Sequence, residues 1–176
     1  MNEPLATIDD VILTVFGNAV DRNTGIKRRR IQQVEHDLRA FLEAAVDTYL
    51  TDDERTLLAA EREFAPEGAA CRALDPEVLF IALIGFITPP HLAPDLLLRR
   101  MQLDLVDALI GYVAYDVLRE YDTSCIRQEL RSAVFRARLE LKRERADQAW
   151  AREVAKSERR RKTLGGSPGY IDEQFR

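Results

Sequence analysis

The chain has 176 residues, of which 46% are hydrophobic and 32% are charged, and its formal net charge is −4. This length suits one domain, or one domain with an extension, and the hydrophobic fraction excludes a wholly disordered chain. Two cysteines exclude a disulfide framework, and the modest glycine and proline content excludes a collagen-like or turn-rich all-β protein.

The first half of the chain opens with two predicted helices. The first is expected after Thr7, whose spacing from Asp10 resembles a capping box, and Gly17 is expected to end it. A longer helix should begin near Ile26, because its hydrophobic residues recur every three or four positions as far as Tyr49. This spacing is typical of one face of an α-helix and differs from the alternation of a strand.

Two further helices are predicted in the middle of the chain. A capping box begins at Thr51 and predicts a third helix that runs to about Phe64. Asp75 is expected to cap a fourth helix, with Pro76 at its first position. Residues 78–88 are apolar nearly all round, so we expect this helix to be the most buried element. Its apolar run is too short to span a bilayer.

The last two predicted helices are long. One opens at Pro94 and Asp95 and carries an apolar stripe as far as Tyr121, and the other begins at Ser124 with an apolar face that ends at Leu141. The sequence thus predicts an all-α bundle of about six helices, with a long, charged C-terminal helix extending beyond the core. We expect a bundle domain over residues 1–141, a basic helical extension over 142–164 and a flexible tail over 165–176.

Charge is sorted by sign along the chain. Residues 22–30 carry five basic residues and no acid, and residues 142–162 carry nine basic and four acidic residues. Residues 31–141 carry 20 acidic and 11 basic residues. We therefore expect an acidic body with two basic regions.

The first basic region contains four consecutive basic residues, which we call the 27–30 basic cluster: Lys27, Arg28, Arg29 and Arg30. They fall at the start of a predicted helix, where positive charge opposes the helix dipole. Such an arrangement calls for an acidic group nearby. The candidates are the protein's own acidic body, a nucleic-acid phosphate and an acidic partner.

The C-terminal helix carries a second basic cluster and two apolar residues among its charges. We call the first the 159–162 basic cluster, which consists of Arg159, Arg160, Arg161 and Lys162. It suits contacts with nucleic-acid phosphates or with acidic protein surfaces, although cations at a helix C-terminus are also favoured by the dipole alone. Trp150 and Val154 leave three interpretations open: a solvated helix, a helix that docks on a partner or a second copy, and a helix that folds back on its own bundle.

Residues with catalytic or metal-binding potential do not form a recognisable site. Around His36 the acidic neighbours at adjacent positions point apart, and His91 follows a proline pair without a metal-ligand spacing. Asp104 and Asp107 share one helix side with Arg100, which favours ion pairing over a metal site. We therefore expect no enzyme, no cofactor and no metal centre.

Residues 24–43 combine a basic start with the segment Asp37-Leu38-Arg39-Ala40-Phe41-Leu42. In both respects this stretch resembles the opening helix of the core-binding domain of tyrosine recombinases. The resemblance implies a DNA-contacting helix face at the 27–30 basic cluster. It implies no catalysis, because the catalytic residues of that family have no counterpart in this chain.

The sequence as a whole favours a non-enzymatic binding protein. The leading hypothesis is a nucleic-acid-associated accessory or regulatory protein that contacts DNA or RNA phosphates through the 27–30 and 159–162 basic clusters. The alternative is a protein-interaction or assembly module, in which the C-terminal helix pairs with itself or with a partner through Trp150 and Val154. The acidic N-terminal residues lack the features of a signal peptide, so we expect a cytoplasmic protein without membrane contact.

Overall fold

The computed structural model describes residues 6–164, with side chains as far as Arg160. Helices and their connections account for all of these residues, so the prediction of an all-α bundle with a long C-terminal helix is confirmed. The predicted flexible tail over residues 165–176 lies outside the described residues. The chain divides into two compact units, Met1–Leu141 and Lys142–Arg176.

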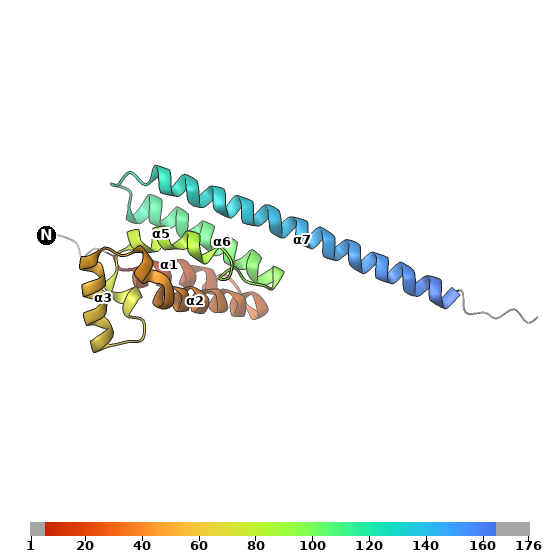
Figure 1. Ribbon diagram of the computed structural model, residues 1–176, viewed down its shortest axis with the longest axis horizontal. Helices are drawn as coiled ribbons and strands as arrows, with labels where there is room; N and C mark the ends of the chain where they lie inside the picture. The colour runs from red at the N-terminus through yellow and green to blue at the C-terminus, as the bar shows by residue number, and fades with distance from the viewer. Residues whose placement is uncertain (1–5, 165–176) are drawn as a thin grey trace, which may run out of the picture. The chain divides into compact units, whose positions relative to one another are not determined.

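Seven α-helices and two short segments of other helix types follow one another in the described residues (Figure 1). In chain order they are α1 (Ile8–Asp21), α2 (Gly25–Ala45), the 3₁₀ helix η1 (Val46–Tyr49), α3 (Asp52–Phe64), α4 (Ala69–Ala73), α5 (Pro76–Phe86), α6 (Leu96–Tyr112), the π-helical segment η2 (Val113–Val117) and α7 (Ser124–Leu164). The five-residue α4 has no counterpart among the predicted helices.

Capping boxes start α1 and α3 as predicted. The Thr7 hydroxyl accepts the Asp10 N–H at 3.3 Å, and the Thr51 hydroxyl accepts the Glu54 N–H at 3.4 Å. In return the Glu54 carboxylate accepts the Thr51 hydroxyl and backbone N–H, and these two hydrogen bonds lower the pKa of Glu54. Each box satisfies backbone groups that a helix start leaves without a partner.

Helix α5 is the most buried helix of the first unit, as its sequence predicts. Glu77 is exposed, and every other residue of α5 is buried or half-buried. The helix contacts α1, α2, η1 and η2. Gly85 allows a close approach to α2 and η1, because a Cβ there would meet the hydroxyl of Tyr49 and lie 3.1 Å from Cζ of Phe41.

A buried amide anchors the loop between α5 and α6. Gln102 is 2% exposed, and its Nε2 donates to the carbonyls of Phe86 at 2.9 Å and of His91 at 3.1 Å. Its Oε1 accepts the Ala93 N–H at 2.9 Å. All the hydrogen-bonding groups involved are satisfied, so this side chain fixes the start of α6 relative to the end of α5.

The first part of α7 lies along α6 (Figure 1). Arg138 on α7 bridges two carboxylates of α6, Asp104 at 2.9 Å and Asp107 at 3.1 Å, and Arg100 lies 3.8 Å from Asp104. These contacts confirm ion pairing as the role of the two aspartates. The buried side chains of α7 end at Leu141, and every side chain from residue 142 to residue 160 is exposed.

Candidate nucleic-acid interface

The 27–30 basic cluster surrounds the start of α2. Its four positions are consecutive and so cover slightly more than one turn of helix, which directs the side chains to all sides of the axis. Lys27, Arg28 and Arg29 are exposed, and Arg30 is half-buried. The structure therefore concentrates four positive charges around one helix end.

None of these four side chains forms an ion pair or a hydrogen bond with another described residue. Other basic side chains of the first unit do have such partners. Arg39 lies 2.6 Å from Asp9, and Arg72 lies 2.9 Å from Glu61. Several basic side chains elsewhere in the unit are thus paired with acidic residues, whereas the 27–30 basic cluster makes no such contact with a described residue.

The backbone at the start of α2 is also open to an anion. Thr24 is the N-cap residue, but its side chain makes no capping hydrogen bond, and Gly25 begins the helix with a φ of 60°. The first N–H groups of an α-helix have no partner within the helix, and they attract anions together with the positive end of the dipole. Backbone and side chains therefore favour the same kind of ligand here.

One carboxylate lies close to this helix start. Asp95 lines a shallow crevice together with Arg29 and Arg30. Its Oδ1 accepts the backbone N–H groups of Leu97 at 3.0 Å and Leu98 at 2.8 Å, which caps α6. Asp95 is thus engaged in capping and forms no ion pair with either arginine.

The predicted residues of the C-terminal helix lie in the second unit. Arg159 and Arg160 are exposed on α7, and the side chains of Arg161 and Lys162 lie outside those that the structure describes. Trp150 is 73% exposed and Val154 is 36% exposed. The 159–162 basic cluster and the 27–30 basic cluster therefore belong to separate units.

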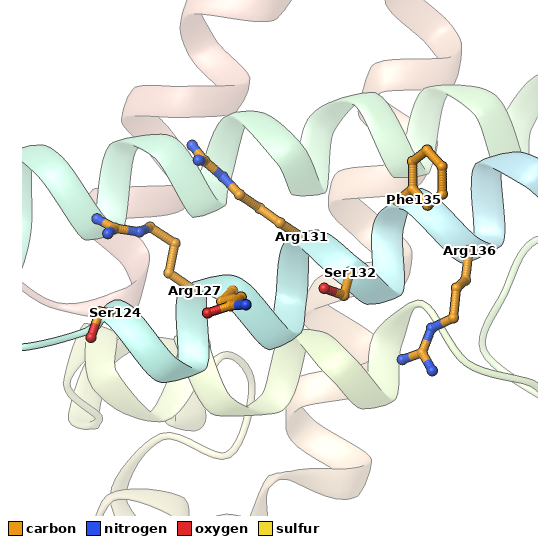
Figure 2. A pocket seen from close by; sticks show the side chains of 7 residues that line it. Ser124, Arg127, Arg131, Ser132, Phe135 and Arg136 are labelled. Carbon is orange, nitrogen blue, oxygen red and sulfur yellow. The ribbon is translucent and has the colours of Figure 1, made fainter.

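Sequence reasoning missed a further basic surface, which we call the arginine–aromatic face: Tyr115, Arg127, Arg131 and Phe135. Arg127 and Arg131 lie over the ring of Tyr115, with Cζ 5.0 Å and 5.8 Å from its centroid. Figure 2 shows Arg127, Arg131 and Phe135 on one side of α7 and Arg136 on the other. These α7 residues line a shallow hollow along the helix.

A signal for this face is present in the sequence. The face follows a spacing of four residues along α7, which places its members on one side of the helix: Arg127, Arg131 and Phe135. The apolar positions that α7 buries, such as Leu130 and Val134, lie between them in the sequence. The net charge of residues 31–141 does not reveal this local group of arginines, because that segment is acidic overall. The contribution of Tyr115 depends on how η2 packs beside α7, which no local pattern shows.

Asp122, an acidic residue just before α7, lies within the electrostatic influence of Arg127. Hydrogen bonds from the hydroxyl and backbone N–H of Ser124 hold the pKa of Asp122 below its ordinary value, and the charge of Arg127 adds a smaller effect. The carboxylate of Asp122 is therefore engaged mainly by Ser124.

No group of three or more histidine, cysteine, aspartate or glutamate side chains among the described residues is arranged to hold a metal ion. None of the helices described is both long enough and apolar enough to cross a bilayer.

The chain matches no protein-family model, no curated protein and no solved structure. The resemblance of residues 24–43 to the core-binding domain of tyrosine recombinases finds no support in these comparisons.

Proposed function

We propose that this protein is a non-enzymatic, cytoplasmic nucleic-acid-binding protein with an accessory or regulatory role, and that the 27–30 basic cluster contacts phosphates. One observation carries the proposal. The four consecutive basic side chains surround a helix start that has no side-chain cap, and they form no ion pair or hydrogen bond with another described residue. Clustered lysine and arginine side chains are the electrostatic signature of phosphate binding.

The energetics of the helix end support the same proposal. Each positive charge in a first turn costs about 0.3–1 kcal/mol at low salt, whereas an anion at that position is stabilised by the dipole and the free N–H groups. A bound phosphate converts this unfavourable arrangement into a favourable one. Because phosphate contacts carry no base information, we expect this cluster to bind without strong sequence preference. The 159–162 basic cluster would add further phosphate contacts.

The test is a binding titration of labelled DNA and RNA at about 50 mM salt, where phosphate contacts are strong. The test variant replaces the 27–30 basic cluster by glutamine (Lys27→Gln, Arg28→Gln, Arg29→Gln and Arg30→Gln). A control variant makes the same change of net charge at exposed positions of α7 (Lys142→Gln, Arg143→Gln, Arg145→Gln and Arg152→Gln).

We expect the 27–30 variant to lose at least tenfold in affinity and the control variant to lose much less. Equal losses would show that net charge alone controls binding, and no binding by the wild-type protein would contradict the proposal. Circular dichroism of both variants checks that the helices are retained.

A second candidate function, assembly through α7, is favoured by one observation. Residues 142–160 form about five helical turns in which every side chain is exposed, and Trp150 is the most exposed large apolar side chain among them. Exposed tryptophans are common anchors of protein interfaces. If α7 pairs with a second copy, light scattering should report a dimer or larger particle. Trp150→Ser should then return the mass to that of a monomer, whereas Phe64→Ser, at a 90% exposed position of α3, should not.

A further inference from the structure

The segment of α7 that carries the arginine–aromatic face is basic, whereas the first unit as a whole is acidic. Four arginines and one glutamate occupy residues 124–139, although residues 31–141 as a whole are acidic. One of these arginines, Arg138, is held by the carboxylates of α6. The remaining three, Arg127, Arg131 and Arg136, line the hollow of Figure 2.

Stacking on Tyr115 positions two of these guanidinium groups. A guanidinium over an aromatic ring gains a cation–π attraction and keeps the N–H donors of its edge available for another ligand. Arg127 and Arg131 share one ring, so both groups are restrained on the same side of α7. Restrained arginines that keep their donors are suited to phosphate oxygens, which they can bind with two hydrogen bonds.

Phe135 adds an exposed aromatic ring one turn further along the same side. Its side chain is 69% exposed, although a phenyl group of this size is normally buried. It lies about 6 Å along the helix axis from Arg131, the rise of four residues. A ring at this place offers a flat, apolar surface next to two cationic groups.

We propose that the arginine–aromatic face binds single-stranded nucleic acid, with Arg127 and Arg131 on phosphates and Phe135 stacked on a base. This combination of a basic surface with an aromatic platform is how proteins hold single strands without sequence preference. The bases of a duplex are stacked on one another, so their faces are closed to Phe135. The inference rests on the proposed function and adds a preference for single strands and the residues that produce it.

The test compares the affinities for labelled oligo(dT) and for a DNA duplex of the same length. We expect Phe135→Ser to weaken binding of the single strand about tenfold, near the lower end of what stacking on one base contributes, and to leave duplex binding unchanged. Phe135→Leu keeps an apolar side chain but removes the ring, and we expect the same selective loss. The matched control is Phe64→Ser, at an exposed phenylalanine of α3, which should change neither affinity.

Each other outcome overturns the inference in a distinguishable way. If the wild-type protein binds both ligands and neither Phe135 variant weakens the single strand selectively, the inference fails while the proposed function stands. If the wild-type protein binds neither ligand, both fail. If poly-glutamate displaces oligo(dT) and Phe135→Ser weakens poly-glutamate binding equally, the face is a site for acidic peptides and not for nucleic acid.

Discussion

Neutralising the first turn of α2 should make the protein more stable, although the same change should weaken its binding of nucleic acid. Lys27 and Arg28 belong to the first four residues of α2, where the dipole acts most strongly. Replacing both by glutamine keeps the helix propensity almost unchanged, since the three residue types have similar propensities. The substitution therefore isolates the electrostatic effect.

The size of this gain follows from the exposure of the two side chains. Each unfavourable charge costs about 0.3–1 kcal/mol at low salt. Both side chains are exposed and solvent-screened, so the lower half of that range applies, and two charges together give about 1 kcal/mol. For a chain of this length, that gain raises Tm by about 2–4 °C.

Thermal and urea unfolding of the double variant Lys27→Gln, Arg28→Gln at low salt would measure the effect. The gain should shrink at about 1 M salt, where the Debye length falls to about 3 Å. The control Arg136→Gln removes an exposed charge from the interior of α7, away from either helix end, and should not stabilise the protein. Lower or unchanged stability of the double variant, or an equal gain in the control, would refute the reasoning.

Three further predictions concern the first unit. Gln102→Ala should lower the free energy of unfolding in urea by about 2–4 kcal/mol, because it leaves the buried backbone groups bonded to Gln102 without a partner. The control Gln32→Ala, at an exposed position, should have almost no effect, and a loss below about 1 kcal/mol for Gln102→Ala would contradict the prediction. Gly85→Ala should destabilise by about 1–3 kcal/mol through collision with Tyr49, whereas Gly111→Ala should stabilise, because its added Cβ meets no side chain or other segment within 4 Å. Thermal unfolding in which both variants shift Tm in the same direction would contradict this packing. Burial raises the pKa of the Cys71 thiol to about 11, so at pH 8 a thiol reagent should modify only the exposed Cys125 while the protein is folded. Rapid modification of two thiols in the folded protein would contradict the burial of Cys71.

Local signals in the sequence predicted most helix starts correctly. The capping boxes at Thr7 and Thr51 are present, and α6 begins directly after Asp95 as expected, because these signals depend only on residues a few positions apart. The burial of α5 was predictable too, since its apolar residues leave no polar face to direct toward water. Asp75 is an exception, because its side chain makes no capping hydrogen bond to α5.

Helix ends were predicted less well than helix starts. Gly17 was expected to end the first helix, but α1 continues to Asp21, because Gly17 adopts ordinary helical backbone angles. The fifth predicted helix was expected to carry its apolar stripe to Tyr121. Instead the α-helix α6 ends at Tyr112, the π-helical segment η2 follows it, and Tyr121 is exposed. A glycine inside a helix costs about 1 kcal/mol relative to alanine and does not have to end it, and the spacing of apolar residues does not report where the backbone changes helix type.

The candidate interface was predictable only in part. The sequence locates the 27–30 basic cluster at a helix start, but the lack of an ion pair depends on where the acidic side chains of other helices lie. The arginine–aromatic face combines residues of η2 and α7, and its essential contact, two arginines on one tyrosine ring, joins positions that are distant in sequence. Tertiary contacts of this kind cannot be read from helix periodicity.

The most direct test of the central claim is the salt dependence of single-stranded nucleic-acid binding. For single strands the logarithm of the binding constant falls with the logarithm of salt concentration by about 0.7 for each phosphate neutralised. If the 27–30 basic cluster contacts phosphates, its glutamine variant should show a slope shallower than that of the wild-type protein by about 2–3. Parallel slopes for the two proteins would contradict the account.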